Sequence, residues 1–161
     1  MPSIAAKLKE LGLALPDPVS PIANYVPIVR SGNLLFVSGQ LAAGQEGIAA
    51  AHRGKLGGSI DLATGQAAAR LCVLNILAHV NKELGSLDKV KSCVQMRGFI
   101  NTMPDYPQMP QVMNGASDLM VAIFGEAGCH ARTTIGVAQL PGDSAVEVEA
   151  IFEVMPFEVM P

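Results

Sequence analysis

The chain has 161 residues, of which 50% are hydrophobic, 16% are charged and 4% are aromatic. This length and composition predict a single domain spanning residues 1–161 and exclude wholesale disorder. Eleven Lys and Arg against fourteen Asp and Glu give a net charge of −3, and because the basic residues do not cluster we expect no nucleic-acid partner.

The apolar character of the chain does not predict a membrane protein. Its longest stretch without Asp, Glu, Lys or Arg covers the 15 residues 31–45, which include polar side chains and glycines. The mean hydropathy of +0.35 is nevertheless high for a chain with so little charge. Because monomers rarely expose large apolar patches, this value indicates that copies of the chain cover part of one another's surface.

The compartment is predicted from the N-terminus and the cysteines. Lys7, Lys9 and Glu10 interrupt the first apolar pattern, which is not typical of a signal or transit peptide. The odd number and wide spacing of the cysteines favour reduced thiols over a disulfide framework or a zinc site: Cys72, Cys93 and Cys129. We therefore expect a cytoplasmic protein with no metal.

The first third of the chain predicts a helix, a hairpin and a loop. Residues 3–15 have apolar positions at helical spacing, and the prolines that follow end this helix. Residues 25–30 and 34–40 read as two strands joined by a tight turn at Gly32-Asn33. The glycine-rich residues 42–58 are expected to form a loop or an irregular strand pair.

The rest of the chain predicts two helices and three strands. Asp61 is the expected cap of a helix that ends at Gly85. Its expected apolar stripe is Ala67, Leu71, Leu74, Ala78 and Leu84. Residues 90–101 form a predicted strand whose inward face is ambiguous, and residues 111–124 a second helix. The last two predicted strands, 132–139 and 145–154, read as a hairpin. This order predicts an α+β fold, with one mixed sheet and two helices on one face.

The final ten residues repeat the sequence Phe-Glu-Val-Met-Pro, first over 152–156 and then over 157–161. The second copy adds nothing to the predicted fold. We assign the C-terminal tail to residues 155–161.

Alternation in the last two strands predicts an apolar face under the helices, formed by Ile135, Val137, Val146, Val148, Ala150, Phe152 and Val154. It places Arg132 and Glu147 on the other face. In the expected hairpin they lie six residues apart, about 20 Å at the usual rise of a strand. Within one chain they could not act on the same small molecule. Between two copies of the chain they could.

Several segments together resemble the Rid (YjgF, liver perchloric-acid-soluble protein) family over residues 21–154. They are Tyr25, Ser-Gly-Asn-Leu-Leu-Phe-Val-Ser-Gly-Gln at 31–40, Ala-Ala-Arg-Leu-Cys-Val-Leu-Asn-Ile-Leu at 68–77, Ala-Arg-Thr-Thr-Ile-Gly-Val at 131–137, and Leu-Pro…Val-Glu-Val-Glu-Ala-Ile at 140–151. Asn-Gly-Ala-Ser-Asp-Leu at 114–119 resembles a branch separate from the best-studied deaminases of the family.

The resemblance implies a chorismate-mutase-like fold and a homotrimer with ligand clefts between its subunits. It implies that Arg132 grips a substrate carboxylate and that Glu147 holds or activates the attacking water. Tyr25, Ser38 and Gly39 match positions that line the cleft. The helix residue that reaches the cleft is either Asn114 or Ser117.

The implied activity is hydrolytic deamination of small enamine or imino acids to 2-oxo acids and ammonia, which needs no cofactor. The alternative is a trimeric module that binds small carboxylates without turnover. An endoribonuclease is not expected from the acidic balance.

One departure from the family's pattern concerns the residues before Arg132. The deaminases usually have proline before Ala-Arg, and here Cys129-His130 stands there. We expect His130 to border the site. We do not expect Cys129 and His130 to act as a nucleophile and its base, because adjacent residues of an extended chain point opposite ways and the sequence shows no third orienting group. A plainer interpretation of Arg132 is an ion pair between subunits, with a glutamate such as Glu149.

Overall fold

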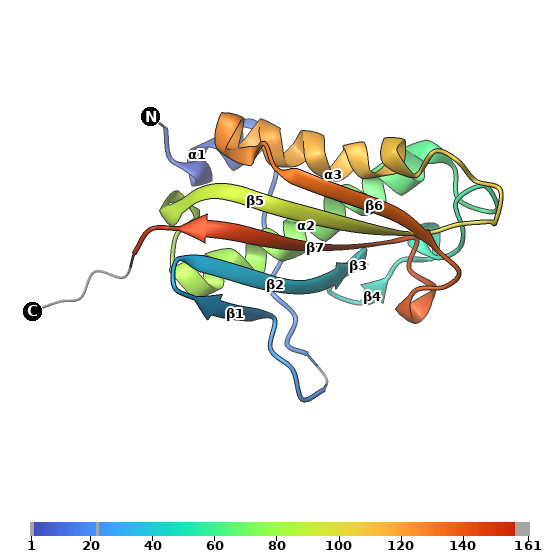
Figure 1. Cartoon of the computed structure of the whole chain (residues 1–161), viewed down its shortest axis with the longest axis horizontal. Coiled ribbons are helices and arrows are strands. Elements are labelled where there is room, and N and C mark those ends of the chain that lie inside the picture. Colours follow the sequence, from blue (N-terminus) through green and yellow to red (C-terminus); the bar gives the residue numbers. More distant parts are fainter. Residues whose placement is uncertain (1, 22, 157–161) are drawn as a thin grey trace, which may run out of the picture.

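The computed structural model describes residues 2–21 and 23–156. It contains one mixed five-stranded sheet in the order β1-β2-β7-β5-β6 (Figure 1). The strands are β1 (Ile28–Ser31), β2 (Leu34–Leu41), β7 (Val146–Val154), β5 (Val90–Asn101) and β6 (Ala131–Val137). The pair β5 and β6 is parallel, and the other neighbouring pairs are antiparallel. The α+β class and the mixed sheet are therefore confirmed.

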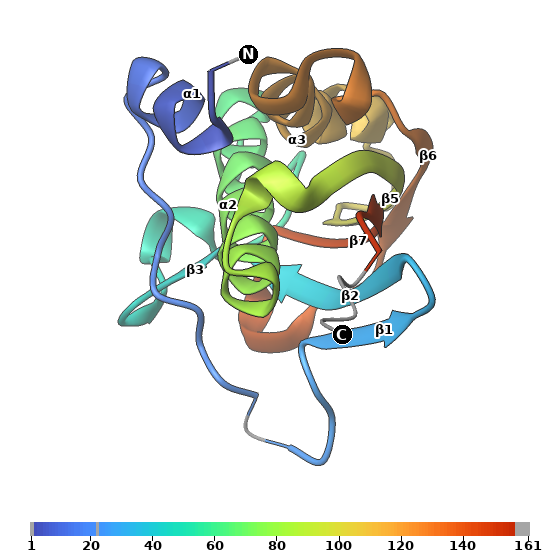
Figure 2. The ribbon, with the colours of Figure 1, turned by 90° about the vertical axis from the view of Figure 1, so that its left-hand side faces the viewer.

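Two long helices, α2 (Leu62–Leu84) and α3 (Met109–Phe124), lie side by side on one face of the sheet (Figure 2). The shorter α1 (Ile4–Glu10) packs against α3 and against the 3-10 turn Leu87–Lys89. A small second sheet pairs β3 (Ala43–Gly44) with β4 (Gly47–Ile48), and 3-10 turns cover Ala50–His52, Gly125–Gly128 and Pro141–Asp143. The first copy of the C-terminal repeat completes β7, and the second lies outside the described residues. None of the described helices meets the length and apolarity that a membrane crossing requires.

The ends of α2 lie where the sequence predicts them. The Asp61 side chain accepts a hydrogen bond from the Thr64 backbone N–H at 2.8 Å. At the other end Gly85 takes the left-handed conformation, with φ of 76°, and its N–H bonds to the Asn81 carbonyl. The predicted apolar stripe is displaced, because Ala67 is exposed and Leu71 and Leu74 are only half-buried. Ala78 and Leu84 of this stripe are buried as predicted, and the buried side of α2 also contains Ala68, Ala69, Cys72, Val73, Ile76, Leu77 and Val80.

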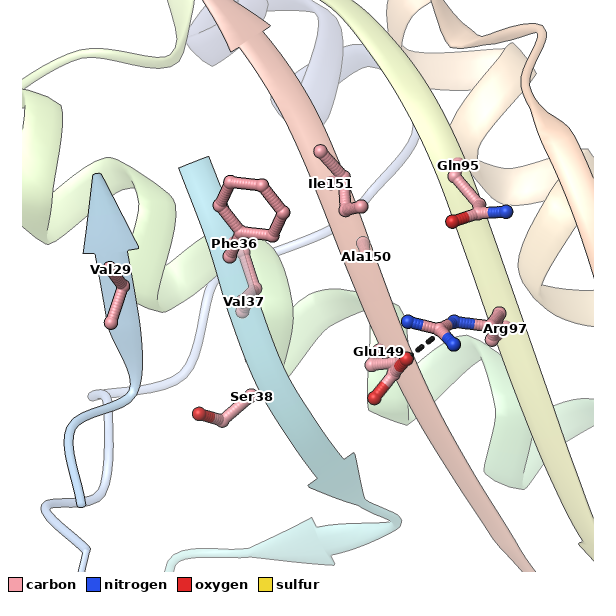
Figure 3. A pocket seen from close by; sticks show the side chains of 9 residues that line it. All are labelled: Val29, Phe36, Val37, Ser38, Gln95, Arg97, Glu149, Ala150 and Ile151. Carbon is pink, nitrogen blue, oxygen red and sulfur yellow. Dashed lines mark ion pairs between the residues drawn. The ribbon is translucent and has the colours of Figure 1, made fainter. Parts of the chain in front are cut away.

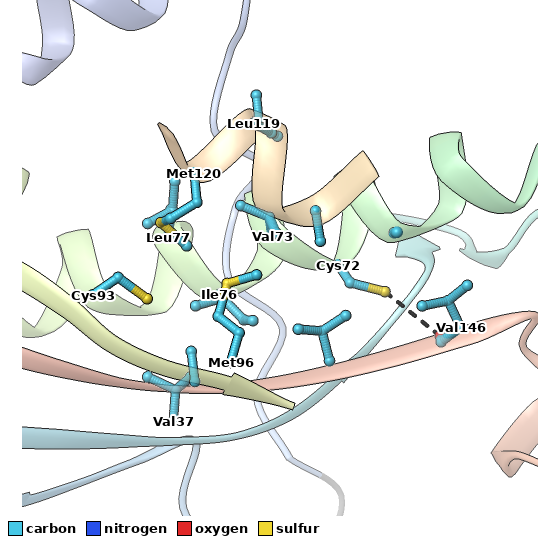
Figure 4. Close-up of a cluster of buried hydrophobic side chains, with 14 of the residues drawn as sticks. Val37, Cys72, Val73, Ile76, Leu77, Cys93, Met96, Leu119, Met120 and Val146 are labelled. Carbon is cyan, nitrogen blue, oxygen red and sulfur yellow. Dashed lines mark hydrogen bonds between the residues drawn. The ribbon is translucent and has the colours of Figure 1, made fainter. Parts of the chain in front are cut away.

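The core lies between these helices and the sheet (Figure 4). The inward side chains of β7 are all buried, as predicted: Val146, Val148, Ala150, Phe152 and Val154. In β5, Cys93 and Met96 both point into the core although simple alternation would put them on opposite faces. A register shift between Cys93 and Gln95 accounts for this, since one extra residue changes which positions face inward.

The predicted hairpin of the last two strands is wrong. β6 pairs with β5 in parallel at the sheet edge, whereas β7 lies between β2 and β5. A strand whose inward residues are all apolar buries most surface between two neighbouring strands, and β7 takes that place. Lys55 fixes the connection between β6 and β7. Its ammonium donates to Asn101 Oδ1, to the Ala138 carbonyl and to Gln139 Oε1.

The predicted faces of β6 are also reversed. Arg132 pairs with the buried Met96, so Arg132 and Gly136 lie on the side of the helices. A Cβ on Gly136 would approach Met109 Sδ to 2.7 Å, which shows how closely the start of α3 packs on this strand. Ile135, expected in the core, is 46% exposed on the open face of the sheet.

Candidate functional site

Arg132 is held by the first half of α3. Its Nη1 donates to Asn114 Oδ1 at 2.8 Å and to Ser117 Oγ at 3.3 Å. Residues three apart share one face of a helix, which lets both side chains reach the same nitrogen. The structure thus brings both alternatives for the cleft helix to the arginine. None of the ion pairs within residues 2–21 and 23–156 involves Arg132. The guanidinium therefore keeps its charge and further N–H donors for an acidic ligand.

His130 belongs to the same cluster. Its Nε2 lies 3.0 Å from Ser117 Oγ, and its Nδ1 lies 2.6 Å from the Gly128 carbonyl oxygen. His130 therefore lies beside Arg132, and the side chain it bonds to is Ser117 rather than Cys129. The group that orients His130 has no signal in the sequence, because it is a backbone carbonyl at the end of the turn Gly125–Gly128. We call Asn114, Ser117, His130 and Arg132 the arginine cluster.

The second cluster lies where β2 meets β7. The register of β2 is irregular between Val37 and Gln40, and Gly39 lies within this irregular stretch. A Cβ on Gly39 would overlap Glu147 Oε1, so only glycine leaves room for the carboxylate in this position. We call Gly39 and Glu147, together with Ser38 and Tyr25, the glutamate cluster.

The lead-in to β1 brings Tyr25 to this cluster. Ser38 Oγ donates to the Val26 carbonyl at 2.8 Å, and the Ser38 N–H donates to the Pro27 carbonyl at 2.9 Å. Tyr25 is 56% exposed, and it lines a cavity of about 500 Å³ together with Gly39. Tyr25 and Gly39 therefore line the same cavity.

Glu147 is a half-buried carboxyl group for which the described residues provide no ion-pair partner. Burial raises its pKa above the ordinary value, and the negative charge of Glu149 raises it further. Burial, and secondarily the Glu147 charge, raise the pKa of the Cys72 thiol. Glu149 itself pairs with Arg97 at 2.6 Å. A carboxylate whose pKa is raised is a stronger proton acceptor than an ordinary one.

The two clusters lie on opposite faces of the sheet. Across the sheet, Arg132 of β6 is level with Met96 of β5 and Ala150 of β7, whereas Glu147 of β7 is level with Phe99 of β5. These two levels are three residues apart along β7, about 10 Å at the usual rise, and β5 lies between β6 and β7. The expectation that Arg132 and Glu147 share a face is therefore wrong. Its consequence stands for another reason: the sheet itself separates the two side chains within one chain.

The described residues contain no group of three or more His, Cys, Asp or Glu placed to hold a metal ion. The candidate site therefore consists of an arginine with neutral hydrogen-bonding partners and a protonatable carboxyl group. This donor set suits a small organic acid and a water molecule.

Comparison with known proteins gives two informative relatives. Protein TCP17 of Trypanosoma cruzi is 45% identical over 151 residues, which cover 93% of each chain. The 2-iminobutanoate/2-iminopropanoate deaminase of Dermatophagoides farinae is 28% identical over 141 residues, which cover 86% of this chain and 92% of that protein.

Solved structures agree with the fold. The protein Atu1372 of Agrobacterium tumefaciens, described as of unknown function, is 44% identical with a TM-score of 0.87, covering 94% of this chain and 92% of its own. A "putative endoribonuclease" of Shewanella oneidensis is 31% identical with a TM-score of 0.91, covering 95% and 100%. The family model described as "YjgF/chorismate mutase-like, putative endoribonuclease" matches residues 5–154. The chain therefore belongs to the YjgF/chorismate-mutase-like (Rid) family.

Proposed function

We propose that the chain is a hydrolytic deaminase of small, reactive imino or enamine acids, and that it works in clefts between the subunits of a homotrimer. The observation that carries the proposal is the state of Arg132: neutral oxygens of Asn114 and Ser117 hold its Nη1, and its charge is left for an acid. A planar guanidinium in this state suits bidentate binding of a carboxylate. The imine deaminase among the relatives supports the choice of substrate.

Association of copies is supported by the open face of the sheet. Figure 3 shows Phe36 and Ile151 standing beside one another on this face, with the Arg97–Glu149 ion pair at the lower end of the same hollow. Phe36 is 41% exposed and Val29 is 54% exposed. Soluble proteins rarely leave an apolar face of this kind exposed to water. We propose that other copies of the chain cover it. We propose that in this assembly the glutamate cluster of one copy lies against the arginine cluster of the next.

The proposed reaction needs positioning and proton transfer. Arg132 holds the carboxylate of the substrate, which is an electrophile already. Water adds to the carbon of the C=N bond while Glu147 of another copy takes one of its protons. The resulting carbinolamine then loses ammonia and becomes a 2-oxo acid. Each step conserves protons, since the substrate nitrogen enters as a protonated iminium and the proton that Glu147 takes returns to solvent before the carbinolamine breaks down.

Two other functions compete with this one. A binding module would hold small carboxylates at Arg132 without turnover. An endoribonuclease, named in the family description, would need a cationic groove for the RNA backbone. The net charge of −3 and the engagement of Arg97 by Glu149 argue against such a groove.

Turnover of an imino acid generated in the assay decides between the enzyme and the module. We expect the protein to accelerate formation of the 2-oxo acid, and Arg132→Ala to lower kcat/KM by about 100-fold or more. Arg70→Ala, which removes an exposed arginine of α2, is the matched control and should behave as wild type. Saturable binding of 2-oxo acids without acceleration would favour the module. Cleavage of single-stranded RNA that Arg132→Ala abolishes would favour the nuclease.

A further inference from the structure

The side chains of Arg132, Ser117 and His130 form one chain of hydrogen bonds whose direction is fixed at both ends. A guanidinium can only donate, so Arg132 donates to Ser117 Oγ. A carbonyl can only accept, so Nδ1 of His130 carries a hydrogen and donates it to Gly128. In a neutral imidazole Nε2 is then the acceptor, and the Ser117 hydroxyl hydrogen points at it across 3.0 Å.

This fixed direction makes the Ser117 hydroxyl sensitive to the state of His130. When the ring gains a proton, Nε2 becomes a donor, and Ser117 Oγ accepts from His130 and from Arg132 at once. The hydroxyl hydrogen must then turn away from the ring. Since Ser117 Oγ lies against the guanidinium, the hydrogen is available to a ligand that Arg132 holds.

We infer that Ser117 and His130 form a proton relay that serves the leaving nitrogen of a substrate bound at Arg132. This inference rests on the proposed deaminase function. Ammonia leaves readily only after its nitrogen is protonated, and Arg132 cannot supply the proton because guanidinium does not give it up in proteins. The relay therefore supplies what the arginine lacks.

The relay starts once the neutral His130 ring has taken a proton from solvent at Nε2. The carbinolamine nitrogen takes the Ser117 hydroxyl proton while Ser117 Oγ takes the Nε2 proton of His130. The C–N bond breaks and its electron pair leaves on ammonia. The carbinolamine hydroxyl gives its proton to the Glu147 carboxylate of the neighbouring copy as the C=O bond forms. His130 is left neutral and Glu147 protonated, and exchange with solvent restores both.

Steady-state kinetics on the full chain test the relay. We expect Ser117→Ala and His130→Gln each to lower kcat by about 100-fold, the usual contribution of general acid catalysis, with little change in KM. Ser117→Thr keeps the hydroxyl group and should recover most of the rate, which a purely structural role of Ser117 would not predict. Asp118→Ala, at an exposed position next along α3, is the control and should leave kcat unchanged.

Nitrogen-15 NMR of the imidazole tests the direction of the chain without any turnover. We expect the Nδ1–H form of His130, and a change at Nε2 but not at Nδ1 in Ser117→Ala. An Nε2–H form would overturn the relay. So would wild-type kcat in Ser117→Ala and His130→Gln while Arg132→Ala is impaired, a result that leaves the deaminase proposal intact. Absence of turnover in the wild type would overturn both.

Discussion

The arginine cluster and the glutamate cluster differ in how their charged groups are held. The guanidinium of Arg132 donates hydrogen bonds to neutral side chains. From Ser117 the hydrogen bonds continue through His130 to a backbone carbonyl. Glu147 lies half-buried over the bare backbone of Gly39, and burial raises its pKa. One cluster holds a positive charge, and the other holds a carboxyl group that binds its proton more tightly than usual. A hydrolytic reaction on a carboxylic acid needs both properties, and the sheet keeps them apart within one chain.

Separating the two clusters should have the largest effect. We expect Phe36→Asp to place a charge on the apolar open face and to dissociate the assembly, which sedimentation would show as a monomer. If the site is shared between copies as we propose, a monomer lacks part of it and turnover should fall by about 1000-fold. Val121→Asp changes a similarly exposed residue on α3 and should leave assembly and turnover unchanged. A fully active Phe36→Asp monomer would contradict the shared site.

The role proposed for Glu147 as the acceptor of a water proton predicts the next effect. Glu147→Gln keeps the shape of the side chain and removes the proton acceptor, so kcat should fall by about 100-fold with little change in KM. Glu46→Gln, at an exposed position, is the control. A rise in KM without a loss of kcat would show instead that Glu147 binds the substrate.

Gly39 offers a smaller change that acts on the same carboxylate. In Gly39→Ala the new methyl group must displace the end of the Glu147 side chain, which is flexible, so the fold should persist. We expect kcat to fall by about tenfold because the carboxylate is moved. Gly44→Ala is the matched control, since a Cβ there meets its nearest atom at 3.9 Å. Equal activity of the two variants would show that the position of the Glu147 carboxylate does not matter.

The smallest expected effect is on stability. The raised pKa of Glu147 means that the folded chain binds the proton more tightly than the unfolded chain. The charged form therefore costs stability above the raised pKa, and this cost disappears as the pH falls below the ordinary value of 4.5. Urea unfolding at one fixed chain concentration should find Glu147→Gln more stable than wild type at pH 8 and equal to it at pH 4. A less stable variant at pH 8 would show that the charge is satisfied in the fold.

Much of the fold could be predicted because its signals are local. Asp61 and Gly85 mark the ends of α2 by capping chemistry, and strict alternation marks β7 as a covered strand. The placement of β6 could not be predicted in the same way. Alternation gives a period of two but not the neighbour that a strand pairs with, and on an edge strand neither set of side chains is fully buried.

For the candidate site too, local features could be predicted and long-range ones could not. The resemblance selected Arg132, and the spacing of Asn114 and Ser117 lets one helix face reach it. The hydrogen bond from His130 to the Gly128 carbonyl had no sequence signal, because a turn and not a side chain supplies the acceptor. Arg132 and Glu147 lie on opposite faces of the sheet because of how β6 and β7 pair with β5. That pairing joins distant parts of the chain, so local patterns do not predict it.

Mixing two inactive variants tests the shared site most directly. Arg132→Ala and Glu147→Gln chains, co-refolded in equal amounts, should regain about a quarter of wild-type turnover, because a random neighbouring pair supplies an intact arginine and an intact glutamate with that frequency. Each variant refolded alone should remain inactive. If the mixture is no more active than its parts although mixed oligomers have formed, the two side chains do not serve one site across copies of the chain.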